Sequence, residues 1–324
     1  MVGMRQRGAG FDGWLICPVC GEPLLIAGDG AADNGAGGAA HGVGMDSSGS
    51  PQGAVRSARG AESVRCARGH SFDLAREGYL NLLRSRRTGD SKEMLLARRA
   101  FLDRGHYQPL AGALADTVGA FLGEQAGAGG CPLRVLDAGC GEGYYLDRLG
   151  QRLSEAPGLV GMLLIGLDSA KEAIRMAAKR CPDAALLVAD LKERLPIADA
   201  SLDAILNVFA PRDLAEFARV LMPGGLLLIA IPSPDHLIEL RLTHGLLGIE
   251  EQKLERLLEA LAPHFVSVGT RDLRYTLHLE SDAVQTLIAM TPSQRHPQRR
   301  LVPEPEGDVS EPTAAFTLVA CRKG

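Results

Sequence analysis

The chain has 324 residues, 46% hydrophobic and 4% aromatic, enough to bury the core of one large domain and a small second module. Its formal net charge of −4 excludes a globally basic surface, so any nucleic-acid contact must come from a local patch. No apolar run approaches membrane-spanning length, and residues 1–10 lack the apolar stretch of a secretory signal. We therefore expect a cytoplasmic protein whose seven cysteines are reduced thiols or metal ligands.

Two pairs of metal-ligating residue types lie near the start of the chain. Two residues separate Cys17 from Cys20, and three separate Cys66 from His70, so each pair can bind one ion from a single turn. Three thiolates and one imidazole form a common tetrahedral set for structural zinc, which leaves no open position for a substrate. Unrelated buried thiols are the alternative, which the paired spacing disfavours. The sequence thus predicts one structural Zn²⁺ held by these four residues.

A segment of unusual composition separates the two halves of this site. Gly and Ala make up over half of residues 27–62, and the segment has no periodic apolar positions. Such a composition cannot build a core, so we expect a disordered insertion within a zinc-binding module at residues 1–87. Loop closure costs entropy only logarithmically with length, so the metal site can tolerate it. Arg84, Arg86 and Arg87 end the module, either as a solvated linker or as contacts to RNA phosphates.

Residues 88–130 carry two helical patterns and form a predicted helical bridge. Asp90 and Glu93 resemble a capping box with Asp90 in the cap position. A second amphipathic helix is predicted from apolar residues that recur every four positions: Leu110, Leu114, Val118 and Leu122.

A buried strand, a tight turn and the start of a helix are predicted at residues 135–145. Two apolar residues lead into Asp137, and Gly139, Gly141 and Gly143 then alternate with other residues. Glycines accept positive φ and let the backbone approach a ligand closely. A nicotinamide enzyme would instead show Gly-x-Gly-x-x-Gly beside a pyrophosphate. The order Asp-x-Gly-x-Gly-x-Gly resembles motif I of class I S-adenosylmethionine (SAM)-dependent methyltransferases.

This resemblance implies an α/β fold over residues 131–324, with a doubly wound, seven-stranded Rossmann-like sheet. Asp168 ends the second predicted strand, where an acid can accept both ribose hydroxyls of the cofactor. Asp190 ends the third, where it could take the adenine amino group or merely cap a turn. Residues 201–211 form the fourth predicted strand and its exit loop, where Asn207 and the Ala210-Pro211 pair could frame the target base. Asn207 could equally be a turn residue at the strand end.

A longer, ordered set of motifs makes the resemblance more specific. Cys-x-x-Cys and Cys-x-x-x-His precede Phe-Asp-x-Ala-x-Glu-Gly-Tyr-x-Asn-Leu-Leu, Gly-Asp-Ser-x-Glu-Met, Ala-Arg-Arg-Ala-Phe-Leu-Asp-x-Gly-His-Tyr-Gln-Pro-Leu and Leu-Asp-x-Gly-Cys-Gly-Glu-Gly-Tyr-Tyr. The set resembles the bacterial 23S ribosomal RNA (guanine-N1)-methyltransferases of the RlmA type, a family with members linked to macrolide resistance. The match is dense from Cys17 to about Leu240, and the insertion at residues 27–62 departs from it.

The resemblance implies methyl transfer from SAM to N1 of a guanine in a 23S rRNA hairpin, with the zinc module gripping the RNA. It implies a lid role for Tyr107 and places His236 near the cofactor. His236 and Asn207 are the candidate catalytic residues, and Asp235 and Asp213 are further candidate bases. Whether the chain forms a homodimer is left open. The expected cofactor-binding set is Tyr107, Asp137, Gly139, Gly141, Glu142, Gly143, Asp168, Asp190 and His236.

Two other functions stay open at this point. A small-molecule SAM-dependent methyltransferase carrying a structural zinc ribbon would have no affinity for RNA. A non-catalytic SAM- or RNA-binding module would bind without turnover, which the intact set of Asp137, three glycines and Asp168 disfavours.

Overall fold

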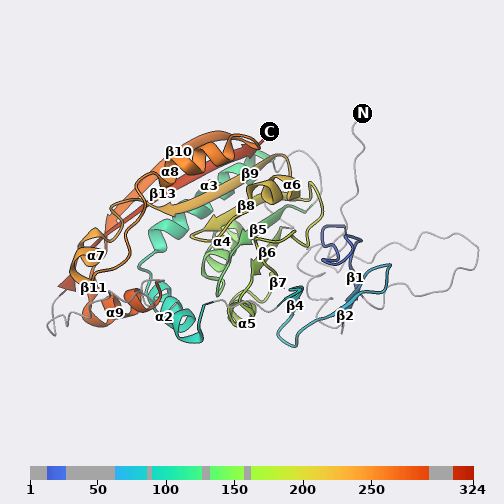
Figure 1. Ribbon diagram of the computed structural model, residues 1–324, viewed down its shortest axis with the longest axis horizontal. Helices are drawn as coiled ribbons and strands as arrows, with labels where there is room; N and C mark the ends of the chain where they lie inside the picture. Colours follow the sequence, from blue (N-terminus) through green and yellow to red (C-terminus); the bar gives the residue numbers. More distant parts are fainter. Residues whose placement is uncertain (1–12, 27–62, 86–89, 126–131, 157–161, 292–308) are drawn as a thin grey trace, which may run out of the picture.

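The computed structural model describes residues 13–26, 63–85, 90–125, 132–156, 162–291 and 309–324. A mixed sheet crosses the molecule, with helices on both faces (Figure 1). The predicted insertion and two of the three clustered arginines, Arg86 and Arg87, lie outside the described residues. Among the described helices, none combines the length and the apolar character needed to cross a membrane.

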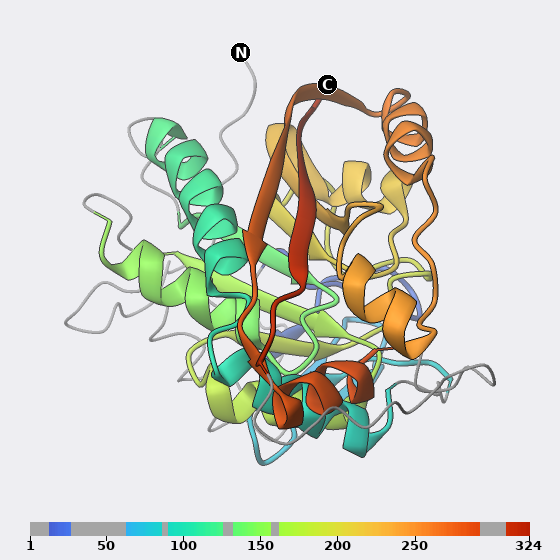
Figure 2. The ribbon, with the colours of Figure 1, turned by 90° about the vertical axis from the view of Figure 1, so that its left-hand side faces the viewer.

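The central sheet has the strand order β10-β13-β9-β8-β5-β6-β7-β4. From the inner strand β5 the chain moves outward to β6 and β7, and then returns to β8 on the other side of β5. This reversal makes a switch point at the carboxyl ends of β5 and β8, where open α/β sheets bind ligands. The strands are β5 (Arg134–Ala138), β6 (Leu163–Asp168), β7 (Ala185–Val188), β8 (Leu202–Val208), β9 (Leu221–Pro232), β10 (Phe265–Thr276) and β13 (Thr313–Lys323). Figure 2 shows β10 and β13 as a long antiparallel pair.

An eighth strand, β4 (Tyr79–Asn81), corrects the seven-stranded prediction. It pairs in parallel with β7, Leu80 facing Leu187. Strand–helix alternation could not reveal it, because four helices and two strands separate it from its partner in the sequence. By its pairing it belongs to the central sheet, although it lies within the segment 1–87 expected to form the zinc module.

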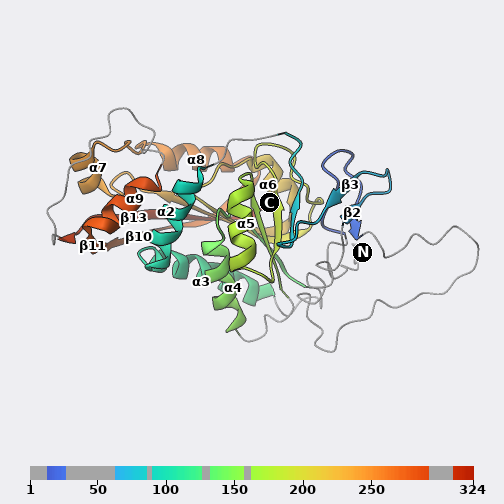
Figure 3. The same cartoon turned by 90° about the horizontal axis from the view of Figure 1, so that it is seen from below.

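The two faces of the sheet carry different layers because successive strand residues point to opposite sides. In β9, Leu226, Leu228 and Ala230 join the core shared with α3 and α4, and the residues between them join the core shared with α6 and α8. The helices α4 and α5 continue the first layer towards β7 (Figure 3). These helices are α3 (Gln108–Gln125), α4 (Tyr144–Ser154), α5 (Lys171–Arg180), α6 (Leu214–Val220) and α8 (Lys253–Leu261).

The bridge helix α2 (Lys92–Asp103) packs against α9 (Ser281–Ala289) at one end of the molecule (Figure 3). Its N-cap is Ser91, whose hydroxyl accepts a hydrogen bond from the Met94 amide at 3.3 Å. The predicted cap, Asp90, instead pairs with Arg98 at 2.6 Å. The same end holds α7 (Ile238–His244) and the short pair β11 (Leu279–Glu280) and β12 (Val309–Ser310).

The zinc-binding segment lies at the opposite end and docks on the sheet layer of α6 and α8 (Figure 1). Its three short antiparallel strands are β1 (Leu25–Ile26), β2 (Ser63–Arg65) and β3 (Ser71–Asp73). Trp14 accepts a backbone hydrogen bond from Ala198 at 2.7 Å, and Ile16 donates one to Pro196 at 3.0 Å. Trp14 is fully buried in the same core cluster as residues of α6 and α8. The segment is therefore continuous with the main body.

Candidate functional site

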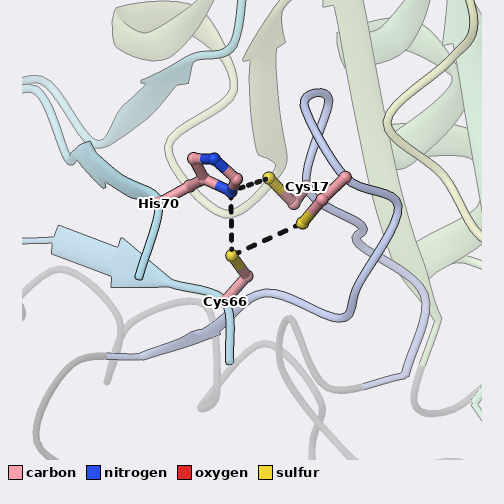
Figure 4. A group of neighbouring side chains, drawn as sticks. Cys17, Cys66 and His70 are labelled. Carbon is pink, nitrogen blue, oxygen red and sulfur yellow. Dashed lines mark hydrogen bonds between the residues drawn. The ribbon is translucent and has the colours of Figure 1, made fainter. Parts of the chain in front are cut away.

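Four potential metal ligands converge in the N-terminal segment. The donor atoms of Cys17, Cys20, Cys66 and His70 all lie within 4.8 Å of one another. Cys17 Sγ is 3.6 Å from His70 Nδ1, Cys66 Sγ is 3.4 Å from the same nitrogen, and Cys20 Sγ is 3.7 Å from Cys66 Sγ (Figure 4). A tetrahedral zinc with Zn–S of about 2.3 Å and Zn–N of about 2.0 Å separates its ligand atoms by roughly 3.5–3.8 Å. The predicted set therefore fits Zn²⁺.

Each half of this cluster folds around one glycine in the left-handed region. Gly21 has φ 76° and donates to the Cys17 carbonyl at 2.8 Å. Gly69 has φ 84° and donates to the Cys66 carbonyl at 2.9 Å. These tight turns fold the chain back so that both donors of each pair face one point.

The glycine loop after β5 forms a closely packed cradle. Gly139, Gly141 and Gly143 have φ of 88°, 55° and 88°, which side chains with a Cβ rarely adopt. A Cβ added at Gly139 would lie 2.3 Å from the Cβ of Ala210 in the β8 exit loop. The loop is tied to β6 because the Gly139 amide donates to the Leu167 carbonyl at 2.8 Å. Gly139 is therefore required both for its conformation and for the close approach of Ala210.

Asp137, the penultimate residue of β5, has a buried carboxylate without a hydrogen-bond partner among the described residues. It is 1% exposed, and within the described structure neither of its oxygens has a hydrogen-bond partner. Burial, reinforced by the charge of Asp168, raises the pKa of Asp137 to about 8. A buried charge without a partner is costly, and a cationic ligand would offset that cost. SAM carries an ammonium and a sulfonium, so the acid and the adjoining cradle fit this cofactor.

Asp168 lies at the carboxyl end of β6 and braces the same loop. Its Oδ2 accepts from the Gly141 amide at 3.0 Å, and its Oδ1 accepts from the Ala170 amide at 2.8 Å. Burial raises the pKa of Asp168, and these two hydrogen bonds oppose that rise. Asp190 follows β7 and accepts from the Lys192 amide at 2.9 Å, as expected of a turn residue.

Glu142 has a structural partner. Its carboxylate is 1% exposed and lies 2.9 Å from Nε of Arg180, which also donates to Asp103 at 2.7 Å. The chain of charges connects the glycine loop to α5 and to the bridge helix α2. The sequence alone did not indicate this role of Arg180, because its partners Glu142 and Asp103 lie 38 and 77 positions away along the chain.

Tyr107 and His236, whose expected roles concern the cofactor, are in direct contact with each other. The hydroxyl of Tyr107 is 3.3 Å from His236 Nε2, and both rings pack on Phe316. The Ala315 amide donates to His236 Nδ1 at 3.2 Å, so the neutral ring holds its proton on Nε2 and donates it to Tyr107. Burial, with a smaller contribution from Arg241, lowers the pKa of His236 to about 4. Neither ring nitrogen is free to accept a proton in this arrangement.

The other candidate catalytic groups are also engaged. The Asn207 amide donates to the Ala138 carbonyl at 2.9 Å and to the Pro211 carbonyl at 3.1 Å, which holds the exit loop against the end of β5. Asp213 caps α6 through the amides of Ala215 and Glu216, both at 3.1 Å. Asp235 pairs with Arg274.

A cavity of about 510 Å³ lies between the zinc-binding segment and the carboxyl end of β7. The sequence did not predict it, because it forms only when the first cysteine turn docks beside residues 189–196. It is lined by Pro18, Leu82, Leu83, Arg84, Ser85, Ala189, Asp190, Glu193, Arg194 and Pro196.

Comparisons with known proteins agree with this geometry. The family described as "Methyltransferase domain" matches residues 135–225, and the zinc ribbon described as "RlmA, N-terminal" matches residues 57–87. The chain is 42% identical to the 23S rRNA (guanine(748)-N(1))-methyltransferase of Streptomyces fradiae over 80% of this chain and 91% of the relative. A provisionally named 23S rRNA (guanine-N(1)-)-methyltransferase of Micromonospora griseorubida is 37% identical over 95% of this chain and 97% of its own. One from Bacillus subtilis, also provisionally named, is 32% identical over 72% and 81%.

Proposed function

The chain belongs to the family of 23S rRNA (guanine-N1)-methyltransferases, and on that basis we propose that it methylates N1 of a guanine in a 23S rRNA hairpin. The observation that carries the proposal is that likeness to these relatives spans both parts of the chain, the cysteine–histidine cluster and the cofactor pocket. A small-molecule methyltransferase would need only the second part. Because its substrate is ribosomal RNA, the enzyme acts in the cytoplasm.

Each of the three aspartates at the strand ends binds a different part of SAM. Asp137 faces the charged methionine portion, Asp168 the ribose hydroxyls and Asp190 the adenine amino group. Tyr107, oriented by His236, covers the bound cofactor. When bound, SAM supplies a methyl group already activated on a sulfonium, so the chain's contribution is binding and orientation.

The RNA path runs from the zinc cluster to the cofactor pocket. Arg84 and Arg194 line the cavity between the two, and arginine pairs readily with phosphate. Asp190 lines the same cavity, so RNA held there lies beside the adenine end of the pocket. The net charge of −4 makes such a local basic contact necessary.

Methyl transfer forms the N1–C bond, breaks the C–S bond and releases the N1 proton. His236, Asp213 and Asp235 each have a partner already, so none is poised to take that proton. We infer that the proton leaves to solvent as the N1–C bond forms and that orientation supplies most of the rate. The N1 edge is paired in a duplex, so the base must be unstacked, which favours a hairpin loop.

The test is methyl transfer from labelled SAM to 23S rRNA transcribed without modification, followed by digestion to nucleosides. The expected product is 1-methylguanosine. Label in another nucleoside would refute the target atom, and no label in RNA or in large ribosomal subunits, with SAM bound, would favour the small-molecule alternative.

A further inference from the structure

Phe209, the first residue after β8, has a backbone conformation that phenylalanine rarely adopts. Its φ is 52°, one of three positive values among the described non-glycine residues. Bulky side chains are strained in this region, so it persists only where the surrounding structure imposes it. The Phe209 amide donates to the Ala230 carbonyl of β9 at 3.2 Å, which holds the strained residue in place.

The ring of Phe209 is the exposed member of an aromatic cluster. It packs on Phe316 with ring centroids 5.4 Å apart and meets the edge of Tyr145 at 6.5 Å. Phe316 is fully buried and also touches Tyr107 and His236. Phe209 is nevertheless 42% exposed. One side of the ring is thus supported by the core while the rest is open to solvent.

Residues on either side of Phe209 contact the end of β5 or the glycine loop. Asn207, near the end of β8, bonds to Ala138 at the end of β5, and Ala210, in the exit loop, packs on the glycine loop where a Cβ on Gly139 would be. The exposed ring therefore lies beside the glycine loop that is proposed to hold the methyl donor. A packing role alone explains neither the strain nor the exposure at this position.

We propose that the open face of Phe209 stacks on the extruded target guanine and holds its N1 edge towards the methyl donor. This inference rests on the proposed function. An unstacked base loses its neighbours in the RNA, and an aromatic side chain replaces them with a flat apolar surface. In this strained backbone conformation the ring remains partly exposed, and stacking on a base would give a reason for both features.

Three substitutions separate stacking from packing. Phe209→Leu keeps an apolar side chain but removes the aromatic face, and Phe209→Gly removes the face while relieving the strain at positive φ. Phe209→Trp retains an aromatic face and enlarges it. With unmodified 23S rRNA, we expect kcat/KM to fall about ten-fold or more for the Leu and Gly variants, the range of base–aromatic stacking. The Trp variant should stay close to wild type, and all three should bind SAM normally.

Stability and fluorescence provide readouts independent of turnover. The Leu variant keeps an apolar side chain against Phe316 and should melt close to wild type even though it is less active, which a structural role would not produce. The chain has one natural tryptophan, the fully buried Trp14. The fluorescence of the Phe209→Trp variant should therefore be quenched by 23S rRNA well beyond that of wild type. Leu242→Ala is the control, because Leu242 is 80% exposed and lies on α7.

The outcomes distinguish this inference from the function on which it rests. Wild-type methylation of 23S rRNA with equally active Leu and Gly variants would overturn the role of Phe209 alone. A Leu variant that melts well below wild type, or unchanged fluorescence of the Trp variant with RNA, would also overturn it. A wild-type enzyme that leaves 23S rRNA unmethylated would overturn the proposed function and the stacking role with it.

Discussion

At the scale of single residues, Asp137 carries the proposed contact to the cationic part of the cofactor. Its carboxylate is buried beside Asp168 and has no hydrogen-bond partner among the described residues. Because the pKa of Asp137 is about 8, its side chain in the ligand-free folded protein stays a neutral acid up to a much higher pH than an ordinary aspartate does. Ionisation then becomes favourable when a positive group is bound.

The stability of ligand-free protein should therefore depend on Asp137 and pH. Because the folded pKa is raised, the contribution of the neutral acid is complete below about pH 4 and is lost as the pH rises through about 8. Asp137→Asn mimics the neutral acid. It should match wild type near pH 4 and exceed it by a few kcal/mol at pH 8, since one pKa unit corresponds to about 1.36 kcal/mol. Urea denaturation across this range measures the difference; a constant difference would contradict the shifted pKa.

Asp168→Ala should weaken SAM binding about ten-fold or more. The change removes the proposed contact to the ribose and frees the Gly141 amide, and a hydrogen bond to a charged group contributes about 1.5–3 kcal/mol. Calorimetric titration with SAM measures it. Asp116→Ala, which removes only an exposed pair with Arg152, is the control. Equal affinities for the two variants would exclude Asp168 from the site.

At the scale of secondary-structure elements, the glycine loop requires glycine at position 139 for two reasons, its backbone conformation and its close contact with the exit loop. Gly139 has a positive φ and leaves no space for a Cβ, whereas Gly112 lies inside α3 with no heavy atom within 4 Å of its added Cβ. The same substitution should therefore have opposite effects at the two positions.

Gly139→Ala should destabilise the fold and abolish measurable SAM binding, because the exit loop must move to admit the methyl group. Gly112→Ala should stabilise the protein by roughly 0.5–1 kcal/mol, the usual gain for this change within a helix. Thermal melts of both variants, with and without SAM, make the comparison. Normal SAM binding by Gly139→Ala would show that the loop is not a close-fitting cradle.

The strand ends were predictable from the sequence, but most of their partners were not. Asp137, Asp168 and Asp190 follow apolar runs, and the rules of parallel sheets place them at one edge, where the structure has them. The cap of α2 was misassigned by one residue, because Asp90 and Ser91 both suit that position and only the distant Arg98 decides between them. β4 was missed because three residues give too short a pattern.

At the scale of the whole molecule, the zinc-binding segment and the cofactor domain share one core. The grouping of the cysteines and the histidine could be predicted from their spacing, but the docking of this segment through Trp14 and Ile16 could not, since these contacts join residues 180 or more positions apart. The cavity beside Arg84 exists only through that docking. The types and spacing of residues can predict a metal site, whereas the position of that site on the sheet depends on tertiary contacts.

Removing zinc should therefore destabilise the entire protein. The double substitution Cys66→Ala, His70→Ala should lose stoichiometric zinc and lower the melting temperature in a single transition. A loss of a few kcal/mol corresponds to a shift of roughly 5–10 °C for a domain of this size. Metal analysis and calorimetry decide this. Two separate transitions, with the cofactor domain unaffected, would contradict a shared core.

Shortening the chain between β1 and β2 should leave the protein intact. Ile26 pairs with Val64 in an antiparallel register, so a two-residue Asn-Gly turn in place of residues 28–62 can connect the strands. Zinc content, melting temperature and SAM affinity should match wild type. A marked fall in any of them would show that the insertion, whose predicted disorder concerns residues outside the described structure, contributes to the fold.

The most direct test of the central claim is reverse transcription of unmodified 23S rRNA after incubation with the enzyme and SAM. N1 lies on the pairing edge of guanine, so its methylation blocks base pairing. We expect one strong stop, located one nucleotide before a guanine in a hairpin. This stop should be absent when the Asp137→Asn variant is used. Methyl incorporation without any such stop would contradict the claim, because a methyl on N7 or on the ribose leaves that edge free.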